Sequence, residues 1–449
     1  MNSPSIEMLP VASLRPYASN ARTHSKKQVR QIAESISRFG FTNPVLVSDS
    51  GEIIAGHGRV MAARELGIAA VPTLRLSHLS AEERRAYVLA DNKLALNAGW
   101  DTEILAIELQ ALIDIEFDAT LTGFSLAEID LTLDQASQAS AAAGDDRADL
   151  IPEPPVEPVS RQGDVWLLGR HRLLCDDARS ADDVARLMNG EEADLIFTDP
   201  PYNVAIDGNV GGLGSVRHRE FAFASGEMSR TEFTQFLTVT LSNASRVAKD
   251  GAIAFVCMDW RHMGELLDAG EAAFTELKNL CVWNKSNGGM GSFYRSKHEL
   301  VFVFKIGTTN SFGLGETGRY RTNVWDYAGI SSLGANRMDE LAMHPTVKPV
   351  ALVADAIKDC SRRNEIVLDL FGGSGSTLIA AESCGRQARL IEYDPAYCDT
   401  IVTRWQTYTG KGAMLADGNS PFEAVGEMRR GWPNSGNGQI SGRRQANVG

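Results

Sequence analysis

The chain contains 449 residues, which is enough for roughly two or three domains. Hydrophobic residues make up 43% of the sequence and charged residues 22%, as in ordinary soluble globular proteins. The formal net charge of −13 argues against a protein that coats nucleic acid non-specifically, although it is compatible with a local basic cleft. No apolar run has the length of a membrane span, and the N-terminus lacks the apolar core of a signal peptide. We therefore expect a cytoplasmic protein without a membrane segment.

The six cysteines show no Cys-x-x-Cys pairing, and several lie inside apolar runs. This usage is typical of buried, reduced thiols, so we expect no metal site.

Residues 1–95 have the pattern of a small domain that mixes strands and helices. A helix is expected from Ser25 to Gly40, and two strands are expected at 44–48 and 52–55. The turn Gly56-His57-Gly58-Arg59 follows directly and opens a second helix. Backbone N–H groups at such a turn can bind phosphate, but the same glycines would equally serve a tight turn alone.

This region resembles the ParB/sulfiredoxin-like N-terminal domain, which has an α+β fold. The resemblance rests on Leu14-Arg15-Pro16-Tyr17, Asn20-Ala21-Arg22, and the run from Ile54 to Arg59 with Ala62-Ala63. It implies a nucleotide site at Gly56, His57, Gly58 and Arg59. No cysteine precedes Cys175, so sulfiredoxin chemistry is excluded.

The remainder of the chain divides by composition. Residues 96–134 are expected to form a helical extension, because Asp101 can cap a helix with an apolar face. Residues 135–162 are rich in Ala, Pro and acidic side chains and predict a linker. Residues 163–415 alternate strands with helices, which predicts a doubly wound parallel sheet, and residues 416–449 are predicted to be a disordered tail.

Within this second domain, an apolar strand at 193–198 ends at Asp199-Pro200-Pro201-Tyr202. The prolines cannot continue a ladder, so a carboxylate and an aromatic ring are held on a stiff turn at the strand's carboxyl end. Open α/β sheets bind ligands at that end.

A second strand, 366–369, runs into a glycine-rich loop and then a helix beginning at Ser376. The glycines allow close backbone approach to a ligand, and Glu392 ends the next strand, where a carboxylate can accept ribose hydroxyls. The loop fits neither the GxGxxG spacing nor a phosphate-binding loop with its lysine, so the pattern indicates a nucleoside cofactor without naming it.

Together these segments resemble the amino-group DNA methyltransferases that use S-adenosylmethionine, in the permuted motif order of the β group. The resemblance implies a Rossmann-like methyltransferase sheet and assigns catalysis to Asp199, Pro200, Pro201 and Tyr202. The residues it assigns to the cofactor are Asp177, Lys348, Asp369, Phe371, Gly372, Gly373, Gly375, Ser376, Thr377 and Glu392. Lys348 belongs to the family segment His344-Pro345-Thr346-Val347-Lys348-Pro349. The chain departs from the family at Asp176, where glycine is usual.

Residues 286–343 occupy the position of the family's target-recognition region. They interleave basic and aromatic side chains, which suit phosphates and bases, although any one of these charges could also be an ordinary solvated residue. The candidate DNA-binding residues are Arg295, Lys297, Arg319, Arg321 and Arg337.

The chemistry of Asp199-Pro200-Pro201-Tyr202 agrees with this resemblance. An exocyclic amine is a poor nucleophile because its lone pair is delocalised into the ring. Asp199 and a backbone carbonyl can each accept one of its hydrogens, while Tyr202 can stack on a base that has left the duplex.

We therefore predict a site-specific DNA methyltransferase that acts on the N6 of a flipped adenine in double-stranded DNA. Aspartate at position 199 goes mostly with adenine in this family, and serine there goes with cytosine N4. The alternatives are cytosine N4 or RNA as acceptor, or an inactive methyltransferase domain on a ParB-like, nucleotide-gated DNA-binding protein. The sequence leaves open the recognition site, a restriction partner as in restriction-modification systems, and a homodimer.

Overall fold

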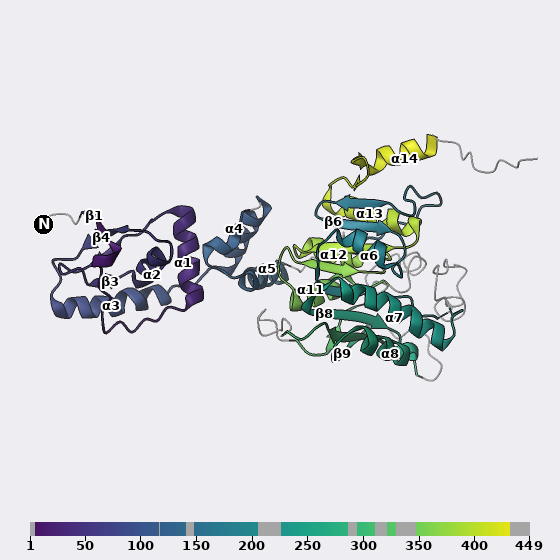
Figure 1. Cartoon of the computed structure of the whole chain (residues 1–449), viewed down its shortest axis with the longest axis horizontal. Coiled ribbons are helices and arrows are strands. Elements are labelled where there is room, and N and C mark those ends of the chain that lie inside the picture. Colours follow the sequence, from purple (N-terminus) through teal and green to yellow (C-terminus); the bar gives the residue numbers. More distant parts are fainter. Residues whose placement is uncertain are drawn as a thin grey trace, which may run out of the picture. The chain divides into compact units, whose positions relative to one another are not determined.

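The computed structural model describes residues 5–115, 117–140, 148–204, 226–285, 294–309, 321–328 and 347–431. The chain divides into two compact units, residues 1–142 and 143–449 (Figure 1). Within the described residues, no helix is long and apolar enough to cross a bilayer. In the same part of the chain, no group of three or more His, Cys, Asp or Glu side chains is placed to hold a metal ion.

The first unit is built on a four-stranded mixed sheet with the strand order β1-β4-β2-β3. Its strands are β1 (Ile6–Pro10), β2 (Val45–Val47), β3 (Ile53–Ala55) and β4 (Ala70–Arg75). Its helices are α1 (Lys26–Phe39), α2 (His57–Glu65) and α3 (Ala81–Leu96). The expected helix and the two expected strands are confirmed; the Ser25 hydroxyl accepts from the Gln28 amide at the start of α1, and Gly40 ends it at φ 76°.

Two further helices, α4 (Thr102–Asp114) and α5 (Leu126–Ser140), pack around Leu109 and Ile129. Asp101 caps α4 as expected. Helix α5 continues to Ser140, past the start of the predicted linker at 135, because Leu133 still packs against this small core.

The second unit contains an eleven-stranded sheet in the order β11-β9-β10-β8-β7-β12-β13-β6-β5-β14-β15. The five central strands are parallel: β8 (Ala248–Met258), β7 (Ala193–Thr198), β12 (Ile366–Asp369), β13 (Gln387–Glu392) and β6 (His171–Cys175). The flanking strands are β5 (Val165–Leu168), β9 (Glu276–Asn284), β10 (His298–Lys305), β11 (Val324–Asp326), β14 (Met414–Leu415) and β15 (Ser420–Pro421). β5 and β10 pair antiparallel with their neighbours.

Helices cover both faces of this sheet, so the unit has three layers (Figure 1). One face packs on α6 (Ala181–Met188), α7 (Arg230–Arg246) and α8 (Met263–Ala273). The other face packs on α11 (Val350–Cys360), α12 (Ser376–Ser383) and α13 (Pro395–Thr409). Along β7 the side chains alternate between the two cores, with Leu195 and Phe197 on one face and Ile196 on the other. The predicted doubly wound α/β sheet with a smaller α+β unit is confirmed.

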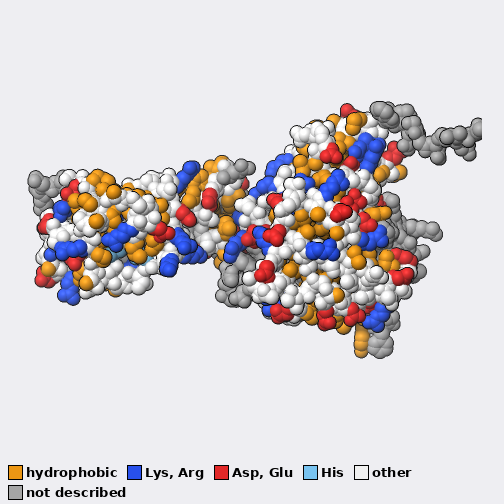
Figure 2. Space-filling view, viewed as in Figure 1, with side chains coloured by type: hydrophobic (Ala, Val, Ile, Leu, Met, Phe, Trp, Pro, Cys, Tyr) orange, Lys and Arg blue, Asp and Glu red, His pale blue; other side chains and the backbone are white. Residues whose placement is uncertain are grey.

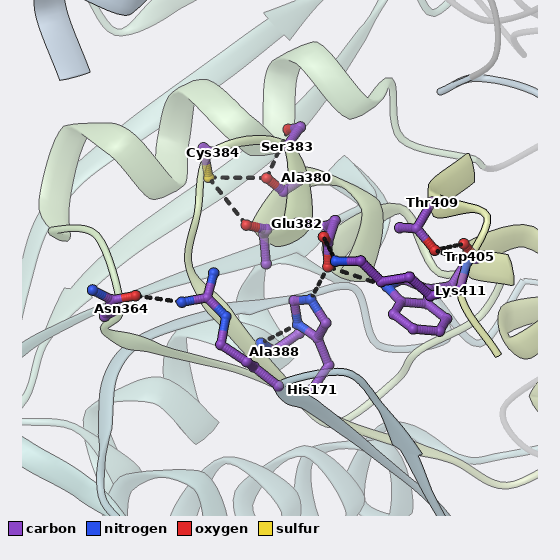
Figure 3. A network of polar contacts seen from close by, with 12 residues as sticks. His171, Asn364, Ala380, Glu382, Ser383, Cys384, Ala388, Trp405, Thr409 and Lys411 are labelled. Carbon is purple, nitrogen blue, oxygen red and sulfur yellow. Dashed lines mark hydrogen bonds and ion pairs between the residues drawn. The ribbon is translucent and has the colours of Figure 1, made fainter. Parts of the chain in front are cut away.

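A buried polar network joins β6 to α12 and α13 (Figure 3). His171 Nδ1 accepts the Ala388 backbone N–H at 2.8 Å, so Nε2 carries the proton and donates to Glu382 at 2.6 Å. Trp405 Nε1 donates to the same carboxylate at 3.2 Å. Burial lowers the pKa of His171, which favours this neutral tautomer. The network fastens the helix that follows the glycine loop to the sheet.

The C-terminal segment differs from the predicted disordered tail. The helix α14 (Phe422–Gly431) follows β15. Phe422 meets Trp166 edge-on at 5.1 Å between ring centroids, and Val425 is fully buried. Arg429 pairs with Asp164. The Gly- and Asn-rich composition hid these few apolar anchors, and residues 432–449 lie outside the described part of the chain.

Candidate active site

The predicted site residues follow four neighbouring strands of the parallel sheet, β7, β12, β13 and β6. Because these strands are parallel, the residues after their carboxyl ends lie along one edge of the sheet. Asp199 follows β7, the glycine loop follows β12, Glu392 ends β13, and Asp177 follows β6. The Asp176 amide donates to the Glu392 carbonyl at 3.1 Å, so the last two positions are directly joined.

Asp199 and Tyr202 belong to a cluster of polar side chains. The Tyr202 hydroxyl donates to Asp199 Oδ1 at 2.6 Å and also contacts Glu299. The Lys348 ammonium donates to Asp199 Oδ2 at 2.6 Å and pairs with Glu299 Oε1 at 2.5 Å. Lys285 pairs with the other Glu299 oxygen at 2.7 Å. Two cations and two carboxylates therefore surround one tyrosine hydroxyl.

Charge and burial set the protonation of this cluster. Burial alone would raise the pKa of Glu299, but Lys348 and Lys285 lower it to about 2. Burial also works against the charge of Lys348, yet the carboxylates of Asp199 and Glu299 keep its pKa above the ordinary value. Burial raises the pKa of Asp199; Lys348 opposes this shift and Glu299 adds to it. Asp199 is thus the carboxylate of the cluster that accepts a proton more readily.

Asp369 organises the glycine loop. Its carboxylate accepts hydrogen bonds from the Thr198 hydroxyl at 3.0 Å, the Phe371 amide at 3.0 Å and the Thr377 hydroxyl at 2.6 Å. Burial raises the pKa of Asp369 to about 7. Because Thr198 directly precedes Asp199, this carboxylate also ties the loop to the strand that carries the candidate catalytic motif.

The glycines of this loop have physical reasons. Gly373 and Gly375 adopt positive φ of 51° and 85°, which other residues rarely do. A side chain at Gly372 would place its Cβ 3.0 Å from Ile401 of α13. The loop therefore lies tightly on α13 and ends at the buried start of α12.

Glu392 and Asp177 lie on either side of the β13–β6 edge. Glu392 accepts the Gly373 and Asp394 amides, each at 2.8 Å, and each carboxylate oxygen keeps a lone pair for a further donor. Burial raises the pKa of Glu392 to about 7. Asp177 is held by the Arg179 side chain, with Nη2 2.6 Å from Oδ2.

Not every predicted residue lies where the sequence placed it. Lys348, predicted at the cofactor, bonds to Asp199 and Glu299. Arg321, predicted at DNA, is bound to Asp359 at 2.8 Å and to the Tyr327 hydroxyl at 2.7 Å. Arg295 and Lys297 are exposed just before β10, whereas Arg319 and Arg337 lie outside the described residues. On the face seen in Figure 2, basic side chains are interspersed with acidic ones.

Two members of the cluster, Glu299 and Lys285, were not predicted as site residues. Glu299 lies near the start of β10, and Lys285 directly follows β9, which is the neighbouring antiparallel strand. A signal existed: Glu299 is an acid within an otherwise apolar strand and is only 6% exposed. Its partners lie 97 and 49 residues away in sequence at Tyr202 and Lys348, so pattern alone could not join them.

In the first unit, the turn at Gly56 begins α2. Gly56 has φ 98°, and a Cβ there would lie 2.9 Å from Arg59 Nη2, so the guanidinium folds back over the turn. Arg59 Nε is buried and has no hydrogen-bond partner among the described residues. His57 Nε2 accepts the Tyr17 amide at 3.2 Å, and Gly58 packs closely on Ile32, so these two residues hold the turn together.

Family models match three consecutive parts of the chain. Residues 1–93 match the ParB N-terminal domain, residues 103–162 match the ParB-methyltransferase HTH domain, and residues 193–403 match the N6/N4 DNA methylase domain. The HTH match was not anticipated from the sequence; it begins with α4 and α5, which are joined by a short turn through Gly123 at φ 97°.

Individual proteins are similar to separate parts of the chain. The ParB-like nuclease domain-containing protein YnaK of Escherichia coli K12 is 58% identical over 76 residues, which are 17% of this chain and 87% of that protein. The DNA adenine methyltransferase YhdJ of the same organism is 26% identical over 265 residues, covering 50% of this chain and 84% of that protein. The DNA modification methylase TTHA0409 of Thermus thermophilus, solved with S-adenosyl-L-methionine, aligns with a TM-score of 0.36 and 19% identity, over 54% of this chain and 96% of that one.

The buried lysine generates a stability prediction. In a Lys348→Met variant the carboxylates of Asp199 and Glu299 lose their shared cation, so we expect unfolding to become easier by about 3–5 kcal/mol in urea titrations. Adding Glu299→Gln removes one of the stranded charges and should restore about 1–3 kcal/mol of that loss.

The matched control is Lys249→Met, which breaks the pair with Asp194 in which Lys249 is 49% exposed. It should cost no more than about 1 kcal/mol. Equal losses in the two single variants would contradict the proposed role of the buried cation.

Proposed function

We propose that this chain, which belongs to the N6/N4 DNA methylase family and carries ParB-like domains, methylates the N6 amino group of adenine in double-stranded DNA. The observation that carries the proposal is the half-buried Asp199 on a stiff turn beside the glycine loop, with Thr198 bonded to Asp369. This arrangement puts a hydrogen-bond acceptor for an amine next to a site for a methyl donor.

Asp199 acts on the nitrogen of the target base in this proposal. Tyr202 and Lys348 each use one lone pair of its carboxylate, which leaves acceptor capacity for an amine N–H. Its raised pKa makes it a better acceptor for the proton that the amine loses. The bonds from the Tyr202 hydroxyl to Asp199 and Glu299 fix the tyrosine ring, so a base flipped out of the duplex finds a preformed stacking surface.

The residues present fit S-adenosylmethionine as the methyl donor. When bound, this molecule supplies an electrophilic methyl group on a sulfonium cation. Glu392 retains lone pairs that can accept ribose hydroxyls, and the Gly373 and Gly375 backbone leaves room for close approach. Asp177 would receive the adenine end through the β6 edge, and the carboxylates along the sheet edge favour a cation.

Adenine is proposed over cytosine because position 199 holds aspartate. The family name covers both N6 and N4 acceptors, and the relative YhdJ carries the name of an adenine enzyme. Cytosine N4 is the second candidate on the same site.

For the first unit, we propose a nucleotide bound at the start of α2. The support is the left-handed Gly56, the buried and unpartnered Nε of Arg59, and the match of residues 1–93 to the ParB N-terminal domain. Burial lowers the pKa of Arg59, and a phosphate at this helix N-terminus would offset the cost of that buried charge.

The central prediction concerns Asp199. Asp199→Ala should abolish transfer of labelled methyl groups to duplex DNA and leave S-adenosylmethionine binding largely intact, because the donor is held by other strands. Asp194→Asn, on the far end of the same strand, should keep activity. Full transfer by Asp199→Ala would overturn the mechanism, and mapping the modified base in the DNA would decide between N6 and N4.

A second prediction follows from the pKa of Glu392. Below about pH 7 its carboxyl is protonated and offers fewer acceptors, so donor affinity should rise by about ten-fold from about pH 6 to about pH 8. Isothermal titration of wild type and Glu392→Gln at each pH separates this effect from ionisation of the donor itself. A variant with the same pH slope as wild type would exclude Glu392.

The nucleotide site is tested with nucleoside triphosphates. Arg59→Ala should lose binding by at least about ten-fold, since a charge-assisted contact is removed. Arg30→Ala breaks only an exposed pair with Glu65 on the neighbouring helix and serves as the control. Equal affinity of both variants, or no binding by wild type, would contradict the proposal.

A further inference from the structure

Arg404 is a buried arginine on α13 that holds the glycine loop from behind. It is 2% exposed, and its Nη1 donates to the Ser374 carbonyl at 2.8 Å. Ile401, one turn earlier, packs against Gly372 and Gly375. Burial lowers the pKa of Arg404 to about 10, so this charge is kept in the interior at a cost.

The second arm of Arg404 binds a different part of the chain. Its Nη2 donates to the Ala148 carbonyl at 2.8 Å. Ala148 begins the segment 148–160, called here the connector, which in sequence follows the first unit and precedes β5. One guanidinium therefore clamps the connector and the glycine loop together.

The connector is fastened at its other end as well. The amides of Val159 and Ser160 donate to the Asp399 carboxylate at 2.5 and 2.9 Å. Both Ala148 and Val159 pack on the hydrophobic core beneath α11 and α13. The composition of this segment predicted a free linker, but its described ends lie against the helix that supports the loop.

The connector also reaches the other half of the site. Asp149 Oδ1 accepts the Val350 amide at 3.4 Å, at the start of α11 and two residues after Lys348. A short stretch of chain thus contacts the elements that position both Ser374 and Lys348.

We propose that Arg404 is a positioning residue for methyl-donor binding and that the docked connector holds it in place. Donor affinity then depends on connector docking, so an event in residues 1–142 that pulls the connector from α13 would weaken donor binding. This inference rests on the proposed function, because it assigns the glycine loop to the donor.

The test loosens the connector without touching the loop. In Asp399→Asn, the amide NH₂ faces a backbone N–H and cannot accept both connector bonds. We expect the dissociation constant for S-adenosylmethionine in the full chain to rise by about ten-fold and DNA affinity to stay unchanged. Amide hydrogen exchange at 371–376 should become faster in this variant. Thr407→Val, an exposed change on the same helix, should alter none of these quantities.

Arg404→Lys provides a second variant that keeps the charge but cannot bridge Ser374 and Ala148. It too should weaken donor binding more than DNA binding, whereas a variant that merely unfolds would lose both. Unchanged donor affinity in both variants would overturn the inference alone. Absence of donor binding by wild type would overturn the proposed function and the inference with it.

Discussion

The second unit depends on a lysine that lies between two carboxylates. Asp199 and Glu299 come from strands β7 and β10, and both contact the Tyr202 hydroxyl. Such a pair would repel in a poorly hydrated site unless a cation offset the charge. Lys348 supplies that cation, and Lys285 neutralises the outer side of Glu299. The cluster is electrically balanced before any base arrives, and this balance keeps the tyrosine ring and the Asp199 carboxylate in one orientation.

The same sheet edge couples the candidate catalytic motif to the candidate donor site. Thr198 bonds to Asp369, Asp369 bonds to Thr377, and Gly373 bonds to Glu392. These contacts run from β7 through β12 to β13, so the methyl acceptor and donor positions share one rigid support. Rigid support matters here because methyl transfer to a weak nucleophile depends on the alignment of two groups.

The fusion of a ParB-like unit to a methylase acquires a physical basis from the connector. A flexible linker would only keep two activities near each other. Here the segment that leaves the first unit is bonded to Arg404 and Asp399, and Arg404 holds the glycine loop. Docking of this kind can transmit a change because the loop's geometry and the connector's position share one side chain.

The sequence by itself determined the parts of this protein that lie within short contiguous stretches. The stiff turn at Asp199, the glycine loop with Gly373 and the acid at Glu392 follow strands that the apolar pattern reveals. Tertiary structure alone decided which distant residues meet. Glu299 joins the catalytic cluster, Lys348 binds Asp199 instead of the glycine loop, and Arg321 is taken up by Asp359. The physical reason is that backbone preferences act over a few residues, whereas ion pairs between strands and burial of anchors such as Val425 are fixed only when the whole sheet has closed.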